Sequence, residues 1–140
     1  MERVILASHG SLASGMRSAL KMIACDVDDI QAYDLDVYNN PKEIHDAIEK
    51  EINSNPDDIF VIVTDLLGGS VHIQLLDLCA NKNVHIVSGM SLGLVLEIYL
   101  TRSDDVVGKI EHALSSSKEA MKIFNAESIN QYLESDEEGL

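Results

Sequence analysis

The 140-residue sequence is short enough for a single domain, and its hydrophobic fraction of 46% is typical of a globular protein with an apolar core. Its net charge of −14 disfavours binding to nucleic acid or anionic membranes, and with 4% aromatic residues and no Trp an aromatic platform for nucleic acid is not expected. The apolar run near the N-terminus is too short for a signal peptide, and none of the runs approaches a membrane span in length. We therefore expect a cytoplasmic protein that binds no nucleic acid.

Short apolar runs alternate along the chain with segments of helical periodicity. Strands are predicted at 3–7, 30–35, 59–64 and 84–88. Helices are predicted at 14–24, 41–53, 70–81, 91–101 and 104–116. This alternation is typical of βαβ units with right-handed crossovers. It predicts an α/β fold, a three-layer doubly wound and mainly parallel sheet with strand order 2-1-3-4.

The helix at 41–53 has the clearest sequence signals. Ile44, Ile48 and Ile52 share one apolar face, Asn40 suits the N-cap, and Pro41 suits the first turn.

The C-terminal part of the sequence changes in character. Residues 119–124 predict a short edge strand, and residues 126–140 carry five acidic and no basic residues. We expect a domain over residues 1–125, followed by an acidic, flexible tail over residues 126–140.

Polar residues follow the first and third predicted strands. His9 and Gly10 end the first strand, Asp65 follows the third, and residues 68–70, Gly-Gly-Ser, open the next helix. In open parallel sheets, ligands bind beyond the carboxyl ends of the strands where the strand order reverses. With the order 2-1-3-4, these residues lie on neighbouring strand ends at that crevice.

These residue types suit nucleophilic catalysis on a phosphoryl group. An imidazole such as that of His9 attacks with one ring nitrogen when a carboxylate, here Asp65, holds the proton on the other. The amides of Gly68, Gly69 and Ser70 offer donors to an anion at a helix N-terminus, and Gly10 permits close approach of a phosphate.

Three motifs together are similar to a known family. The sequences "SHG" at 8–10, "DLLGGS" at 65–70 and "GMSLGLVLE" at 89–97 resemble the mannose-type enzyme IIA component of the bacterial phosphoenolpyruvate–sugar phosphotransferase system. The resemblance extends in order and spacing over about residues 3–124.

The resemblance implies a phosphoryl carrier. His9 would accept the group from the phosphohistidine of HPr and pass it to a IIB component, which phosphorylates a sugar during uptake through a membrane permease. Asp65 and Ser70 would correspond to the family's active-site aspartate and pocket serine. Because partner proteins supply the phosphoryl group, no cofactor is expected. Family members are commonly homodimers that exchange a C-terminal edge strand, here 119–124.

The sequence departs from the family pattern beside this site. Val71-His72-Ile73 stands where members often have Pro, a bulky apolar residue and Asn. Leu67 and Gly93 replace a Trp and a Pro of some members. The pair of His9 and Asp65 is unaffected.

Other functional hypotheses use some of the same residues. A regulatory module read by a partner would use the same chemistry of His9, and a metal-dependent enzyme would use His9, Asp65 and His72. A histidine phosphatase is disfavoured, because Ser8 replaces the arginine of its Arg-His-Gly motif.

Each of these residues also has a simpler structural interpretation. Asp65 could cap a loop, Ser70 could cap a helix, and Gly68 and Gly69 could serve a turn. His72 is expected to be solvated. Structural roles without specific partners are expected for the remaining histidines, and small buried positions for the cysteines: His45, His85, His112, Cys25 and Cys79.

Overall fold

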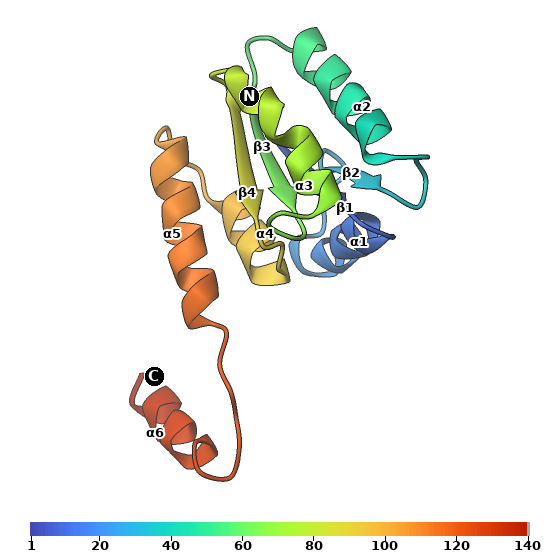
Figure 1. Cartoon of the computed structure of the whole chain (residues 1–140). Helices are drawn as coiled ribbons and strands as arrows, with labels where there is room; N and C mark the ends of the chain where they lie inside the picture. Colours follow the sequence, from blue (N-terminus) through green and yellow to red (C-terminus); the bar gives the residue numbers. More distant parts are fainter. Residues whose placement is uncertain (140) are drawn as a thin grey trace.

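Four parallel strands form the central sheet in the order β2-β1-β3-β4 (Figure 1). The computed structural model describes residues 1–139. The strands are β1 (Glu2–Ser8), β2 (Gln31–Asp34), β3 (Ile59–Thr64) and β4 (Val84–Ser88). The predicted strand order is confirmed, and β3 and β4 have the predicted bounds.

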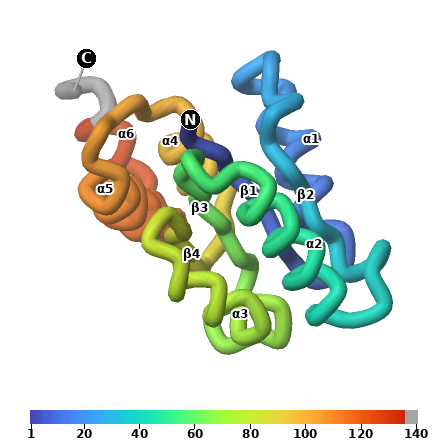
Figure 2. Tube along the Cα trace, turned by 90° about the horizontal axis from the view of Figure 1, so that it is seen from above, coloured from blue at the N-terminus to red at the C-terminus, as the bar shows by residue number. Residues whose placement is uncertain are grey.

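Helices cover both faces of this sheet. They are α1 (Leu12–Ala24), α2 (Pro41–Ser54), α3 (Ser70–Leu75), the short 3₁₀ helix η1 (Leu76–Ala80), α4 (Leu92–Leu100) and α5 (Val106–Glu119), and α6 (Ile129–Gly139) follows them in the chain. One apolar core lies between the sheet and α1, α4 and α5, and a second lies between the sheet and α2, α3 and η1 (Figure 2). Successive residues of β1 enter opposite cores, because side chains alternate along a strand. The predicted three layers are confirmed.

Local sequence signals explain where α2 begins. The side chain of Asn40 accepts a hydrogen bond from the amide of Glu43 at 3.1 Å, and Pro41 occupies the first helical position. Both features match the prediction. The helix predicted at 70–81 is instead divided between α3 and η1.

The C-terminal part differs from the prediction. Helix α5 reaches Glu119, and residues 121–125 have no strand geometry, so the expected edge strand at 119–124 is absent from the sheet of the single chain. Within the predicted acidic tail, α6 forms and stands apart from the sheet (Figure 1). The rings of Phe124 and Tyr132 pack edge to face at 4.8 Å and connect α6 to the preceding segment.

The prediction of buried cysteines is wrong. Cys25 and Cys79 are free thiols, and both are exposed. Cys25 lies beyond the last turn of α1 with a φ of 67°, and Cys79 follows the buried Leu78 in η1 on the outer side. No helix within residues 1–139 is long and apolar enough to cross a membrane.

Candidate active site

The backbone turn after β1 is fixed by buried polar groups. The hydroxyl of Ser8, fully buried, accepts a hydrogen bond from the amide of Ala13 at 2.7 Å and so caps α1. The carboxylate of Asp34, at the end of β2, also accepts from an amide in the first turn of α1. Gly10 has a φ of +52°, a conformation that other residues rarely adopt. The turn holds His9 at the carboxyl end of the sheet.

A single carboxylate oxygen orients the His9 ring. Oδ2 of Asp65 lies 2.9 Å from the backbone nitrogen of His9 and 2.9 Å from its Nδ1. Because an ionised carboxylate only accepts hydrogen bonds, Nδ1 carries the proton and Nε2 carries the lone pair of the neutral ring. Burial raises the pKa of Asp65, but the hydrogen bonds from the His9 amide and ring outweigh it, and the pKa is lowered. Asp65 is therefore ionised at neutral pH.

Exposure differs between the two partners. The side chain of His9 is 43% exposed, whereas that of Asp65 is 10% exposed. The hydroxyl of Ser70 lies 3.2 Å from Nε2, the nitrogen that carries the lone pair. A nucleophile that is accessible, with a buried group holding its tautomer, is the arrangement that attack by imidazole requires.

Different structural features favour glycine at the two positions before Ser70. Gly68 has a φ of +79°, whereas Gly69 has an ordinary backbone and is the N-cap of α3. A Cβ on Gly69 would lie 3.0 Å from Cε1 of His9 and 3.1 Å from the carbonyl oxygen of Leu66. A larger residue at position 69 would therefore crowd the imidazole of His9 and the Leu66 carbonyl.

The prediction that His72 is solvated is wrong, because the side chain is buried. Its Nδ1 lies 2.8 Å from Oγ1 of Thr64, which is itself fully buried, and only 7% of the residue is exposed. The phase of α3 explains the difference, because its inward positions include Val71, His72 and Leu75.

The structure gives no support to a metal site built from His9, Asp65 and His72. Nδ1 of His72 is directed to Thr64, and that of His9 to Asp65. Among residues 1–135, whose side chains are described, the one group of acidic, histidine or cysteine atoms close enough to share an ion is His45, Asp46 and Glu49, on α2.

His45 has partners that the sequence did not indicate. Its Nδ1 lies 3.0 Å from Asp46, and its Nε2 lies 2.8 Å from Asp77 of η1. Burial lowers the pKa of His45, but the hydrogen bonds to Asp46 and Asp77 outweigh it, and the pKa is raised above 6.5. His112 also has an acidic neighbour, Glu97, at 3.3 Å.

Sequence analysis missed Thr64 and an apolar rim around the site. Thr64 ends a predicted strand, and its place just before the candidate carboxylate Asp65 was the available signal. The rim consists of large hydrophobic side chains exposed on the segments that follow the carboxyl ends of the strands: Leu12, Val37, Leu66, Leu67 and Ile73. The consecutive leucines in a glycine-containing turn were the available signal.

The family comparison decides the identity of this α/β domain. A family model described as the PTS system fructose IIA component matches residues 3–114. The chain belongs to this IIA family of the sugar phosphotransferase system. The family resemblance stated from the sequence is thus confirmed, and the IIA domain is a sugar phosphotransferase module that works with other components of that system. No curated protein sequence matches the chain.

Solved structures share the IIA fold. A protein assigned as a phosphoenolpyruvate-dependent sugar phosphotransferase system permease from Klebsiella pneumoniae is 24% identical, with a TM-score of 0.81 over 87% of this chain and 90% of its own. Component EIIA from Streptococcus agalactiae is 24% identical, with a TM-score of 0.75 over 89% and 98% of the two chains. The mannose/sorbose specific IIA subunit from Enterococcus faecalis is 16% identical, with a TM-score of 0.76 over 89% and 95%.

Proposed function

We propose that this IIA domain is a cytoplasmic phosphoryl carrier in which Nε2 of His9 accepts a phosphoryl group from phospho-HPr and passes it to a IIB component. One observation carries the proposal: Oδ2 of Asp65 lies 2.9 Å from Nδ1 of His9, which leaves the accessible Nε2 as the nucleophile. Catalysis then needs no cofactor, because both partners are proteins that hold the group covalently.

The transfer step moves one phosphoryl group between two nitrogens. The lone pair on Nε2 of His9 attacks the phosphorus atom, the new N–P bond forms, and the N–P bond in HPr breaks with its electron pair left on the donor imidazole. The proton on Nδ1 stays in place throughout. The carboxylate of Asp65 stabilises the positive charge that develops on the ring.

Groups around Nε2 suit the incoming anion. The Ser70 hydroxyl, 3.2 Å from Nε2, can turn from the lone pair to a phosphoryl oxygen. Ser70 begins α3, where the first amides lack partners within the helix. With Gly10, Gly68 and Gly69 free of side chains, the amides and the phosphoryl group can approach closely.

The apolar rim supports docking of protein partners around His9. Leu67 is 74% exposed and Ile73 is 59% exposed beside the Gly-Gly-Ser turn. Exposed apolar side chains around a reactive group mark a protein contact surface. The net charge of −14 would steer a basic partner to it.

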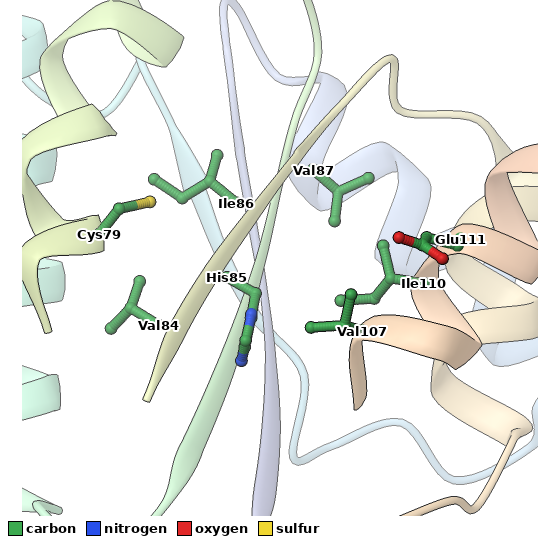
Figure 3. A pocket seen from close by; sticks show the side chains of 8 residues that line it. All are labelled: Cys79, Val84, His85, Ile86, Val87, Val107, Ile110 and Glu111. Atoms are coloured by element: carbon green, nitrogen blue, oxygen red, sulfur yellow. The ribbon is translucent and has the colours of Figure 1, made fainter. Parts of the chain in front are cut away.

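A groove along β4 supports the homodimer that the family resemblance implies. β4 is an edge strand, and a groove of about 260 Å³ runs beside it between η1 and α5 (Figure 3). Its lining is mainly apolar: Cys79, Val84, His85, Ile86, Val87, Val107, Ile110 and Glu111. Met121 and Ile123 are each 79% exposed in the single chain. We propose that the segment 119–124 of a second copy pairs with the edge of β4. This pairing would cover the groove of one copy and the exposed apolar side chains of the other copy's segment.

The test of the carrier function is intact mass measurement after incubation with phosphoenolpyruvate, enzyme I and HPr. We expect the mass to rise by one phosphoryl group, with a label that is labile in acid and stable in base, as a phosphorus–nitrogen bond is. His9→Ala should accept none, and His112→Ala, which removes an exposed histidine on α5, should accept the group normally. No added mass on the unaltered chain, or full labelling of His9→Ala, would overturn the proposal.

A second step separates transport from regulation. A mannose-type IIB component should remove the label from the phosphorylated chain. Retention of the label in the presence of IIB would instead support a regulatory module that is read by another partner.

A further inference from the structure

A buried hydrogen bond joins the end of β3 to the first turn of α3, next to the candidate site. Oγ1 of Thr64 and Nδ1 of His72 are 2.8 Å apart, and both residues are buried, at 0% and 7% exposure. Oγ1 of Thr64 is also 3.5 Å from the carbonyl oxygen of Val87 in β4. Because neither side chain is open to solvent, a group that lost its partner here would have no ready substitute.

This bond joins the two ends of the loop that carries the site. Thr64 is the last residue of β3, and His72 lies in the first turn of α3. Asp65 and residues 66–70 lie between them. Within the loop, the amide of Gly69 also donates a hydrogen bond to the carbonyl of Leu66, at 3.0 Å. The side-chain bond therefore ties the start of α3 to the strand that carries Asp65.

The His9 ring lies against the start of α3. Its Nε2 is 3.2 Å from Oγ of Ser70, and Cε1 is close enough to Gly69 that a Cβ there would lie 3.0 Å away. A small shift of α3 would move Ser70 and Gly69 relative to Nε2. Misplacement by about 1 Å can reduce the rate of an oriented reaction about 100-fold.

We infer that His72 is a positioning residue for phosphoryl transfer: through its hydrogen bond to Thr64, it holds Ser70 and Gly69 against the ring of His9. The inference rests on the proposed carrier function and deepens it. His72 touches neither the phosphoryl group nor the reacting nitrogen in this role. It acts through the placement of α3.

The first experiment compares substitutions that keep or remove the hydrogen-bonding atom. His72→Asn places a polar atom near the position of Nδ1, whereas His72→Leu fills similar space without one. In single-turnover transfer from phospho-HPr, we expect His72→Leu to reduce the first-order rate constant about 10- to 100-fold, with little change in half-saturation by HPr. His72→Asn should retain the rate within about threefold, and Thr64→Val should match His72→Leu.

A matched control and a double substitution separate positioning from general destabilisation. His112→Leu makes the same change at an exposed histidine of α5 and should leave the rate unchanged. Adding His72→Leu to Ser70→Ala should reduce the rate by much less than it does alone, because the group that His72 positions is already lost. An equal reduction in both backgrounds, or a normal rate in His72→Leu, would overturn the inference.

A spectroscopic readout does not depend on HPr. In the unphosphorylated chain, we expect a nuclear Overhauser effect between Hε1 of His9 and the α-protons of Gly69. His72→Leu should weaken it and His72→Asn should preserve it, with both variants folded by their amide spectra. An unchanged effect in folded His72→Leu would contradict the inference even if the donor is not HPr. Failure of the unaltered chain to accept a phosphoryl group would instead contradict the carrier function.

Discussion

One carboxylate distinguishes the two nitrogens of His9. Oδ2 of Asp65 contacts the backbone amide and Nδ1 of the same residue, each at 2.9 Å, so the ring can rotate little without breaking a bond. The other oxygen, Oδ1, is buried without a hydrogen-bond partner among the described residues. The orientation of the His9 ring therefore depends on one oxygen atom and its charge.

Asp65→Asn tests the role of that charge. An amide can present its NH₂ group to Nδ1 and stabilise the tautomer with a proton on Nε2, which cannot attack. We expect the rate of phosphorylation by phospho-HPr to fall about 10²- to 10⁴-fold, with the fold retained. Asp57→Asn, at an exposed turn before β3, is the control and should react normally. A rate of Asp65→Asn within a few fold of the original would contradict this role.

Gly69→Ala and Gly68→Ala should differ in what they impair. The Cβ at position 69 would press on the imidazole and on the Leu66 carbonyl, so phosphorylation should slow about tenfold or more. Position 68 has open space but a φ of +79°, so its substitution should lower the free energy of unfolding by about 1 kcal/mol. Equal phosphorylation rates in the two variants would show that the contact with His9 has no effect.

Sequence analysis could predict the residues whose position follows from topology. His9 and Asp65 end neighbouring strands, and the strand order alone brings them together. The burial of His72 depends on which face of α3 is turned to the core. A helix of six residues is too short for the sequence periodicity to show which face that is. The proposal that Nε2 rather than Nδ1 is the nucleophile depends on the distances between His9 and Asp65.

At the scale of elements, His45 connects α2 to η1. It lies between Asp46 of its own helix and Asp77 of η1, and Glu49 lies 4.0 Å from the same Nε2. The pKa of His45 is raised, so the protonated form is stabilised by folding. This contribution is fully present below the unfolded pKa of about 6.5 and is lost as the pH rises through the higher pKa of the folded state.

His45→Gln should therefore destabilise the protein in a pH-dependent way. We expect the free energy of unfolding to fall by about 1–3 kcal/mol at pH 5.5, and by less at pH 8.5, because the neutral imidazole loses its charged hydrogen bonds. Urea unfolding at both pH values measures the difference. His112→Gln, at an exposed site, is the control. An effect of His45→Gln that is larger at pH 8.5 than at pH 5.5 would contradict this account.

The boundaries of elements were predictable where the sequence signals are local. Asn40 and Pro41 mark the start of α2, and the apolar run at 59–64 is β3. The break of the predicted helix at 70–81 into α3 and η1, and the helix at 129–139, have no such local signal. The apolar residues of segment 119–124 predict a strand. A strand forms only when it pairs with a neighbour, and in the single chain this segment does not pair with the free edge of β4.

At the scale of the whole molecule, two surfaces remain uncovered: the apolar rim around His9 and the groove along β4. They lie on different parts of the fold, since the rim follows the carboxyl ends of the strands and the groove follows one edge of the sheet. A dimer formed at the groove therefore leaves His9 accessible to protein partners.

Two truncations test the dimer. Light scattering at micromolar concentration should give twice the mass of one chain. Deletion of residues 126–140 removes α6 but keeps the pairing segment, so the dimer should persist. Deletion of residues 121–140 should give a monomer with lower stability, because the groove is left uncovered. A monomeric full chain, or a dimer that survives the longer deletion, would contradict the exchange.

The central claim is that Nε2 of His9 carries the phosphoryl group while Asp65 holds the proton on Nδ1. Long-range ¹H–¹⁵N spectra of the chain with ¹⁵N-labelled histidine, recorded before and after phosphorylation by phospho-HPr, test it most directly. The account predicts coupling of phosphorus to Nε2 of His9 and a retained proton on Nδ1. Phosphorus on Nδ1, or on a residue other than His9, would contradict it.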